Sequence, residues 1–582
     1  MSRNDEIATL LEEFADLLDA KDVAYKPSSY RRAAENVREY PKPVEELAAE
    51  GTDAVEEIDR VGDAIASKIV EYVETGHIEE LDDLREELPV DMAVLTNVEG
   101  VGPKTVGKLY EALGITTLDE LEAAAREGKI QEVKGFGAKT ETNILDGIEF
   151  AREATGRETL GKAVPLADDL LAYLTESDAV GRAEPAGSMR RWRETVGDID
   201  VLVGSGDPET VLDHFLAWDL VGDTIEAGAQ KASIRVNAMR VDLRVVDPSE
   251  YGAALQYFTG SKDHNVHLRN VAIDRGLKMN EYGLFDVADV SDPDSDPRVG
   301  TRVAGETEES MYAALDLPLI PPEMREDTGE IEAATDGSLP DLIEEGEIRG
   351  DLHTHTVWSD GDNTIAEMVA AAEERGYDYH VVSDHATGPG MVGGVGVEDD
   401  DLLEQIDEVR AVAADSDITV FTGVEANIDA EGGISVDDDV LDELDVVIAS
   451  PHSALDQDRE TATERLVRAM EHPAVDILGH PTGRLINQRP GLSVDYERLA
   501  DAAVEHGVAL ELNASPYRLD LNGEALKIAV EAGATIAIDT DAHRPAELDH
   551  VRYGIHTARR GWVETADVIN TWSVDELTAF LH

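Results

Sequence analysis

Gly187-Ser188-Met189-Arg190-Arg191, followed six residues later by Gly197-Asp198-Ile199-Asp200, is the stretch on which the interpretation of the chain depends. Asp198 and Asp200 are two residues apart, so on a strand their side chains share one face. Neighbouring carboxylates repel each other unless a cation lies between them, and a divalent metal is the usual one. The Gly-Ser turn offers backbone N–H groups and a hydroxyl to a phosphate, and the two arginines add positive charge. The combination predicts a phosphate-and-metal site, whereas each piece alone would fit a solvated surface turn.

A second strand is predicted at 240–246, where charged and apolar residues alternate. If it lies beside the strand at 198–203, Asp242 completes a triad of carboxylates with Asp198 and Asp200.

Acidic residues outnumber basic ones along the whole chain: 125 Asp and Glu stand against 49 Lys and Arg in 582 residues, a formal net charge of -76. A charge of that sign normally argues against nucleic acid as a partner. Because the acidic residues cover the outer faces of the predicted helices, the surface resembles that of cytoplasmic proteins from salt-accumulating halophiles. At molar salt the Debye length is about 3 Å, so repulsion from DNA is screened, but loose Lys and Arg contacts are weakened as well. A nucleic-acid enzyme there would need other contacts.

The chain contains no cysteine, which excludes disulfides, thiolate nucleophiles and thiolate metal ligands. Its polar, acidic N-terminus is unlike a signal peptide, and no apolar run is long enough to span a bilayer. We therefore expect a cytoplasmic protein without membrane attachment. The length predicts several domains, each with its own core.

A short internal repeat marks the first 150 residues, which have helical periodicity. An apolar residue precedes Gly-x-Gly at a helix start at 98–104 and again at 133–139, and in a degenerate copy at 58–63 Arg60 replaces the first glycine. Two glycines permit a positive φ and close approach of a phosphate to helix-start N–H groups. The repeat resembles the helix-hairpin-helix, which implies backbone contacts to DNA at Gly100, Gly102, Gly135 and Gly137.

Residues 1 to about 320 resemble a family X DNA polymerase, the family of eukaryotic DNA polymerase beta. Four phrases carry the resemblance in chain order: GSMRR at 187–191, GDID at 197–200, RVD at 240–242 and YFTGS at 257–261. The resemblance implies two Mg²⁺ ions that bridge the incoming triphosphate and activate the primer 3′-hydroxyl. The implied catalytic ligands are Asp198, Asp200 and Asp242.

The same resemblance implies contacts to the nucleotide and to DNA. A serine, an arginine and a glycine turn would hold the β- and γ-phosphates, and two aromatic residues would pack against the sugar. Asn265 would reach the minor-groove edge of the nucleotide, and Arg269 would reach the template strand. The implied nucleotide contacts are Gly187, Ser188, Arg191, Tyr257, Phe258, Gly260 and Asn265, and the implied DNA contacts are Arg240 and Arg269.

Lys68, on a helix predicted from Ala64 to Thr75, falls on the family's Schiff-base lysine, which removes an abasic sugar phosphate. Tyr30 matches a residue near that site. A lysine on an acidic helix also fits a solvated surface, and the degenerate hairpin at Arg60 counts against the lyase. Both interpretations stay open.

The C-terminal third begins after residues 321–347, which are rich in Pro, Glu and Asp and predict a linker. Short apolar strands then alternate with amphipathic helices, which predicts a parallel sheet covered on both faces. About seven such units, with polar residues at the carboxyl ends of the strands, predict a barrel like the TIM fold. Imidazole and carboxylate recur at those ends, and this donor set suits Mn, Zn or Fe better than Mg.

The ligand set resembles the PHP (polymerase and histidinol phosphatase) domain. The resemblance implies up to three metal ions, Mn²⁺ or Zn²⁺, and phosphoester hydrolysis by a 3′–5′ exonuclease, with abasic-site endonuclease or 3′-phosphatase as a further activity. Arg484 and Arg518 would clamp the phosphate. The implied ligands are His353, His355, Asp360, His385, Glu425, His452, His480, Asp541 and His543.

Together the patterns and the two resemblances imply a multidomain fold similar to the bacterial/archaeal family X type with a C-terminal PHP domain. It combines α-helical N-terminal helix-hairpin-helix domains, an α+β nucleotidyltransferase palm and thumb, and a distorted TIM-like (β/α)7 barrel of the α/β class. The predicted boundaries are 1–90 for a helical DNA-binding and lyase-like domain, 91–158 for a fingers-like helix-hairpin-helix domain, 159–247 for the palm, 248–320 for the thumb-like domain, 321–347 for the linker and 348–582 for the PHP domain.

The expected function is short-gap filling in base-excision repair, by a monomer acting on gapped or primed DNA with dNTPs. Template-independent nucleotidyl transfer uses the same three carboxylates and is a second interpretation, although Tyr257-Phe258, Arg269 and the hairpins favour templated synthesis. A third, a DNA-end-binding scaffold with nuclease activity only, gives no reason to keep mutually repelling acids at Asp198 and Asp200.

Overall fold

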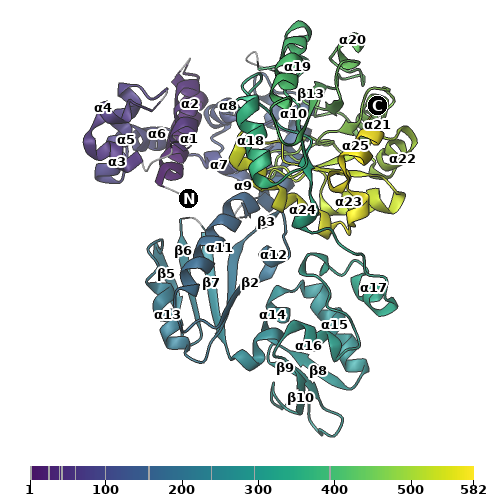
Figure 1. Cartoon of the computed structure of the whole chain (residues 1–582). Coiled ribbons are helices and arrows are strands. Elements are labelled where there is room, and N and C mark those ends of the chain that lie inside the picture. The colour runs from purple at the N-terminus through teal and green to yellow at the C-terminus, as the bar shows by residue number, and fades with distance from the viewer. Residues whose placement is uncertain are drawn as a thin grey trace. The chain divides into compact units, whose positions relative to one another are not determined.

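The chain divides into two units, residues 1–157 with 487–490 and residues 158–486 with 491–582 (Figure 1). The computed structural model describes residues 3–23, 26–38, 40, 44–58, 60–96, 98, 100–154, 157–237, 239–293, 295–391 and 395–581. Asp59 and Glu99, which belong to two of the hairpin repeats, lie outside the described residues. None of the described helices combines the length and the apolar character needed to cross a bilayer.

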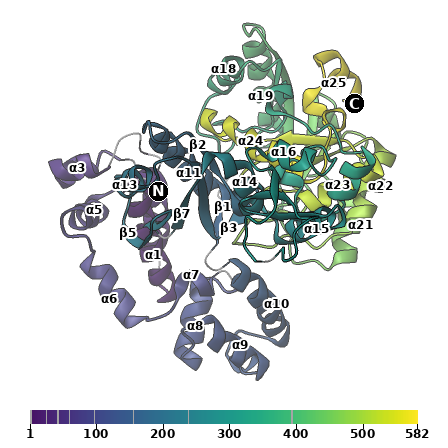
Figure 2. The ribbon, with the colours of Figure 1, turned by 90° about the horizontal axis from the view of Figure 1, so that it is seen from below.

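The first unit is helical, as its periodicity predicts. Its helices are α1 (Arg3–Ala20), α2 (Lys26–Arg38), α3 (Val44–Glu50), α4 (Thr52–Val55), α5 (Asp63–Thr75), α6 (Glu79–Glu87), α7 (Met92–Leu95), α8 (Pro103–Leu113), α9 (Leu118–Arg126), η1 (Ile130–Glu132) and α10 (Ala138–Ala154). Figure 2 shows α3, α5 and α6 in one group and α8, α9 and α10 in another, and α1 contacts members of both. Ile7, Leu11 and Phe14 of α1 are buried, and Phe14 stacks on Tyr30 at 4.5 Å between ring centroids.

A five-stranded sheet opens the second unit. Its strands are β2 (Arg182–Pro185), β4 (Asp198–Gly204), β5 (Asp223–Ala227), β6 (Lys231–Val236) and β7 (Met239–Val246), in the order β2-β4-β7-β6-β5. Strands β4 and β7 run parallel, and the other neighbours are antiparallel. The apolar side chains of β4 and β7 form one hydrophobic cluster with helices α11 (Leu160–Thr175) and α13 (Pro208–Leu216). Because strand side chains alternate, the acidic residues of β4 and β7 share the opposite face.

A second, smaller sheet and its helices follow. The elements are α14 (Tyr251–Thr259), α15 (Lys262–Asp274), the antiparallel strands β8 (Leu277–Asn280), β9 (Gly283–Asp286) and β10 (Thr301–Ala304), and α16 (Glu308–Ala313). A short strand pair, β1 (Glu158–Thr159) with β3 (Thr195–Val196), and helix α12 (Gly187–Arg190) flank the five-stranded sheet.

Residues 321–347 are folded, so the prediction of a linker is wrong for this segment. It forms η3 (Pro322–Met324), α17 (Glu330–Asp336) and η4 (Glu345–Glu347) and contributes Met324 and Ile331 to the core under α15 and α16. Arg325 is fully buried and donates to Glu308 (2.6 Å) and to the carbonyl of Ile320 (2.9 Å). The charged composition suggested that the whole segment is exposed to solvent, but Glu323, Arg325 and Glu330 are buried and paired.

The C-terminal region is the predicted seven-stranded parallel barrel. Its strands follow chain order: β11 (Gly350–Asp351), β12 (Tyr379–Val382), β13 (Thr419–Asn427), β14 (Val446–Ser450), β15 (Ile477–Leu478), β16 (Ala509–Asn513) and β17 (Ile536–Asp539). Figure 1 shows helices around these strands, among them α18 (Ile365–Arg375), α19 (Asp399–Ala413), α21 (Arg459–Met470), α22 (Tyr496–His506), α23 (Gly523–Ala532) and α24 (Val551–Arg560). The barrel is nearly closed, because Thr354, beyond β11, forms a parallel bridge with Ala542, beyond β17.

Candidate functional site

The three aspartates predicted as a triad come together on the five-stranded sheet. Asp200 of β4 lies directly opposite Asp242 of β7 in the parallel register. Carboxylate oxygens of Asp198, Asp200 and Asp242 lie within 4.8 Å of one another. Burial and the charges of Asp198 and Asp242 raise the pKa of Asp200 to about 6. Three acids at this spacing form an oxygen-only donor set that fits a divalent cation.

Two basic side chains compensate the charge of Asp242. Arg240 donates to both of its oxygens (2.8 and 3.0 Å), and the Lys231 Nζ lies 2.8 Å from its Oδ2. Burial raises the pKa of Asp242, but hydrogen bonds from Arg240 and Lys231 outweigh it and leave the pKa lowered. Sequence reasoning missed Lys231, because its proximity to Asp242 depends on strand pairing. On β6 it stands opposite Arg244, two residues beyond Asp242.

The Gly-Ser turn lies against the triad. Gly187 has φ +61°, and a Cβ added to it would lie 2.5 Å from Asp200 Oδ2. Ser188 follows on the half-buried helix α12. Arg191 donates from Nε to Glu326 (3.1 Å) and from Nη1 to the carbonyl of Thr259, and its guanidinium fills the space beside Gly260. Gly187, Ser188, Arg191 and Gly260 are therefore neighbours, as the resemblance implies.

Helices α14 and α15 bring the remaining predicted nucleotide residues close together. Tyr257 and Phe258 meet edge to face at 5.1 Å, and Arg244 lies over the Phe258 ring at 4.6 Å. Asn265 donates to the carbonyl of Tyr257 (2.8 Å). Arg269 is one helical turn further along α15 and is exposed.

The nine predicted barrel ligands converge at the carboxyl ends of the strands. Three overlapping groups could each hold a metal ion: His355, Asp360, His385 and His543; His353, His355 and Glu425; and His385, Glu425 and His452. The remaining two predicted ligands adjoin these groups. Asp541 Oδ1 lies 3.0 Å from His355 Nε2, and His480 Nε2 lies 2.9 Å from Glu425 Oε1.

Within the described part of the chain, several buried atoms of this centre lie near charged neighbours but make no hydrogen bond of good geometry, as expected of atoms that ligate a cation. They are His353 Nε2, His355 Nδ1 and Nε2, His385 Nδ1, Glu425 Oε2, His452 Nε2 and His480 Nδ1. Burial lowers the pKa of His355 to about 4 and that of His480 to about 3, so both rings are neutral at pH 7 and offer a lone pair. Burial also acts on Glu425, but the surrounding histidines outweigh it and lower the pKa of that carboxyl well below its usual range.

Two neighbouring side chains, which sequence reasoning missed, hydrogen-bond to the predicted ligands. Glu511 on β16 lies 2.6 Å from His353 Nδ1, and Asn427 on β13 lies 2.7 Å from His452 Nδ1. Both stand at the same rim of the barrel as the ligands, which is the signal that could have found them. A hydrogen bond to the ring nitrogen that does not bind the metal fixes the tautomer and the orientation of a ligating imidazole.

Of the two arginines predicted to bind the phosphate, one lies near the predicted metal ligands and the other does not. Arg518 Nε lies 3.6 Å from Asp541 Oδ2, at the metal-ligand cluster. Arg484 instead donates to Glu194 (3.0 Å) and to the carbonyl of Leu519, so it contacts the segment before β3 rather than the metal-ligand cluster.

The hairpin repeats have the backbone geometry that their glycines predict. Gly100 and Gly135 have φ +77° and +99°, and Cβ atoms added to Gly100, Gly102, Gly135 or Gly137 would meet nothing within 4 Å. Arg60 in the degenerate copy also has a positive φ, +60°. All three copies therefore share the turn, and open space adjoins the glycines of the two intact ones.

Lys68 is held on α5 by an ion pair rather than solvated. Its Nζ lies 2.7 Å from Glu80 and 5.3 Å from the centroid of the Phe14 ring. Burial lowers the pKa of Lys68, but Glu80 and Tyr30 outweigh it and leave the pKa raised. A Schiff-base nucleophile needs the neutral amine, so this arrangement counts against rapid lyase chemistry at neutral pH.

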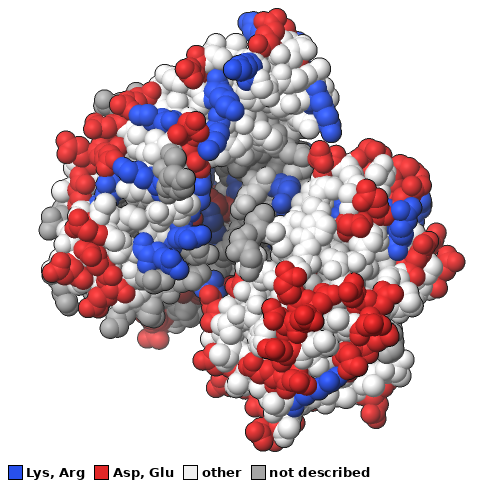
Figure 3. Space-filling model, turned by 90° about the horizontal axis from the view of Figure 1, so that it is seen from above, with Lys and Arg blue, Asp and Glu red and all other residues white. Residues whose placement is uncertain are grey.

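The surface carries the charge imbalance of the sequence. Figure 3 shows acidic side chains spread over the visible face, with lysines and arginines in smaller groups between them. Contacts to an anionic partner must therefore be local.

A carboxylate triad on one sheet and a histidine-rich barrel rim are the arrangement of an enzyme with two separate candidate centres for divalent metals. Four family models match successive segments: the helix-hairpin-helix domain at 2–78, the SAM-like helix-hairpin-helix tandem at 92–149, the DNA polymerase beta thumb at 254–326 and the PHP domain at 351–515.

Curated proteins of both activities are similar to the chain. The DNA polymerase/3'-5' exonuclease PolX of Bacillus subtilis is 36% identical over 581 residues, 99% of each chain. DNA polymerase lambda of Rattus norvegicus is 25% identical over 343 residues, 56% of each chain. A probable phosphatase of Caldanaerobacter subterraneus is 33% identical over 244 residues, 40% of this chain and 90% of that protein. The chain belongs to the family X DNA polymerases that carry a C-terminal PHP domain.

Proposed function

We propose that this chain is a DNA-directed DNA polymerase that fills short gaps in repair, with a 3′–5′ exonuclease in its barrel. The observation that carries the proposal is the presence of two intact and chemically different donor sets in one chain. One consists of three carboxylates beside a phosphate-binding type of turn, and the other of imidazoles and carboxylates with unpartnered buried atoms. Full-length similarity to the Bacillus subtilis polymerase/exonuclease supports the pairing of the two activities.

At the carboxylate triad, Asp198, Asp200 and Asp242 would hold two Mg²⁺ ions. When bound, such ions would neutralise charge on the triphosphate and lower the pKa of the attacking hydroxyl. Arg240 and Lys231 balance the charge of Asp242 until the cations bind. Arg191 and the turn at Gly187 and Ser188 would bind the phosphates, while Tyr257 and Phe258 would pack against the sugar.

At the barrel rim, the nine ligands would hold up to three Mn²⁺ or Zn²⁺ ions, which supply hydroxide and neutralise phosphate charge. Neutral His355 and His480 offer nitrogen lone pairs, Glu425 offers a carboxylate shared by two groups, and Arg518 would bind the substrate phosphate. Glu511 would orient the His353 ring through the contact to its Nδ1.

The protein would act as a cytoplasmic monomer on gapped or primed DNA with dNTPs. The glycine turns of the hairpins would contact the DNA backbone through main-chain N–H groups, which suits a chain of net charge -76. The acidic surface supports an origin in a salt-accumulating cytoplasm, where screening permits this contact.

A labelled gapped duplex in molar KCl, with Mg²⁺ and Mn²⁺ compared, tests the proposal. Asp198→Ala or Asp242→Ala should abolish extension and leave metal-dependent degradation. The double variant His353→Ala/His355→Ala should remove degradation and leave extension. Loss of both activities in either variant would contradict two separate centres, and extension that ignores the template base would favour template-independent transfer.

A further inference from the structure

The barrel helix α24 covers the residues that follow the Gly-Ser turn of the polymerase site. Trp192, directly after Arg191, stacks on His556 of α24 with 3.8 Å between ring centroids and 7° between the planes. His556 and Arg559 of the same helix both bind Glu323 of η3, each at 2.8 Å. The backbone around Arg191 is therefore held by a helix of the other catalytic domain.

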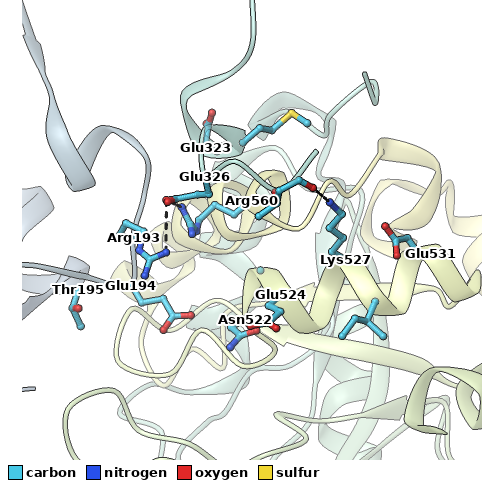
Figure 4. Close-up of a pocket in the computed structure, with 14 residues that line it drawn as sticks. Arg193, Glu194, Thr195, Glu323, Glu326, Asn522, Glu524, Lys527, Glu531 and Arg560 are labelled. Atoms are coloured by element: carbon cyan, nitrogen blue, oxygen red, sulfur yellow. Dashed lines mark hydrogen bonds and ion pairs between the residues drawn. The ribbon is translucent and has the colours of Figure 1, made fainter. Parts of the chain in front are cut away.

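Glu326 connects this helix to the Arg191 side chain. A single oxygen, Oε1, lies 3.1 Å from Arg191 Nε, 3.1 Å from Arg560 Nη1 and 3.7 Å from Arg193 Nη1. Figure 4 shows Glu326 between Arg193 and Arg560, at the edge of a cavity of about 600 Å³. Arg560 is the last residue of α24, so the carboxylate joins the barrel to the nucleotide side of the polymerase site.

Arg560 also holds the main chain of Arg191. Its Nη1 donates to the Arg191 carbonyl at 2.7 Å. The contacts form a closed loop, from the Arg191 guanidinium through Glu326 to Arg560 and back to the Arg191 backbone. Arg560 thus contacts the Arg191 backbone directly and its guanidinium through Glu326.

The loop leaves part of the Arg191 guanidinium available. Its Nε is bound to Glu326 and its Nη1 to the Thr259 carbonyl, whereas Nη2 makes no hydrogen bond within the described part of the chain. Burial raises the pKa of Glu326, but Arg560, Arg191 and Arg193 outweigh it and keep the carboxyl ionised. A planar guanidinium held by two nitrogens points its third in a fixed direction, which is what phosphate recognition needs.

We infer that Glu326 and Arg560 are positioning residues for Arg191, so that the affinity of the polymerase site for dNTP depends on a side chain of the exonuclease domain. This inference rests on the proposed role of Arg191 in binding the triphosphate. It means that the barrel influences nucleotide binding at the polymerase site. The aspartates that carry the chemistry are not part of the loop, so the barrel should not affect them.

Steady-state gap filling by full-length variants tests the inference. Arg560→Gln and Glu326→Gln should each raise the KM for dNTP about tenfold, equal to ~1.4 kcal/mol of binding, and change kcat and exonuclease rate less than about twofold. The double variant should be no worse than either single one, because both break the same loop. Arg560→Lys, which can restore one of the two contacts, should recover part of the affinity.

Arg498→Gln is the matched control. Arg498 lies on helix α22 of the same barrel and pairs with Glu460 at 2.9 Å, and it contacts neither Glu326 nor Trp192 within the described part of the chain. It should leave the KM for dNTP unchanged. If Arg560→Gln instead lowers kcat for extension and the exonuclease rate together, with a lower melting temperature and an unchanged KM for dNTP, the inference is overturned. Arg560 would then have a purely structural role.

Arg191→Gln separates the inference from the function on which it rests. If this variant binds dNTP normally, the proposed role of Arg191 is wrong. If it raises the KM for dNTP while Arg560→Gln and Glu326→Gln do not, the role of Arg191 stands and the positioning loop alone is refuted.

Discussion

Replacing Gly187 by alanine is the sharpest available perturbation of the polymerase site, because it adds one methyl group and removes no charge. The new Cβ would lie 2.5 Å from Asp200 Oδ2, whereas ordinary contacts begin at 3.4 Å. The carboxylate must therefore turn or shift by about 0.9 Å. Gly187 also has φ +61°, which costs an alanine about 1–2 kcal/mol.

The displacement predicts a large effect on extension and a small one on folding. A misplacement near 1 Å can reduce a rate about 100-fold, so kcat for gap filling should fall by about that factor. The exonuclease should be unchanged, because its ligands lie in the barrel. Single-turnover extension, exonuclease rate and thermal unfolding should be measured on the same preparation.

Gly206→Ala provides the control for this experiment. Gly206 is exposed, follows β4 in the same sheet, and a Cβ added there would meet nothing within 4 Å. It should retain full extension. If kcat for gap filling by Gly187→Ala is within about threefold of that of the unmodified protein, then the position of Asp200 does not depend on the absence of a side chain at residue 187, and the reasoning is refuted.

The other predictions concern the barrel, Lys68 and the thumb-like region. Glu511→Gln should weaken metal binding at His353 by about 10- to 100-fold, seen as lower metal content and exonuclease rate, while extension is retained; unchanged metal content would refute the orienting role. Lys68→Ala should abolish borohydride trapping on an abasic substrate, and Glu80→Gln, which removes the charge that raises the pKa of Lys68, should shift trapping to lower pH; trapping that persists in Lys68→Ala would refute Lys68 as the Schiff-base nucleophile. Burial lowers the pKa of His264, which lies between Glu330 and Tyr312. Below pH 6.5, His264 is therefore protonated in the unfolded chain but still neutral in the folded one. Unfolding free energy should therefore fall by up to about 1.4 kcal/mol per pH unit below 6.5, and His264→Gln should flatten that slope in pH-dependent melting.

Local patterns located most of the site because the relevant geometry is itself local. Two residues on one strand share a face, and parallel strands bring their carboxyl ends to one rim. Spacing and family resemblance together therefore named the three aspartates and the nine predicted barrel ligands that the structure brings together. The hairpin glycines were visible for the same reason, since a positive φ belongs to a single residue.

Features that depend on distant partners were not predictable in this way. Arg325 and Arg484 belong to stretches whose composition suggests solvent or ligand contact, yet each pairs with an acid far away in the chain, Glu308 and Glu194. Segment 321–347 therefore folds, although its composition resembles a linker. The partner of a buried charge depends on tertiary packing, which no local pattern specifies.

Two opposing reactions on one 3′ end can share a chain if their centres respond to different inputs. An oxygen-only triad and an imidazole-rich rim favour different cations, so the proposed metals can occupy the two centres independently. The loop from Arg560 through Glu326 to Arg191 adds a mechanical link, but it touches the phosphate side of the polymerase site and leaves Asp198, Asp200 and Asp242 alone. A change in α24 would therefore alter how tightly the nucleotide is held rather than the rate of the chemical step. Because weak nucleotide binding leaves the primer end unextended for longer, this placement gives the barrel influence over the balance of synthesis and degradation without direct contact between the two metal centres.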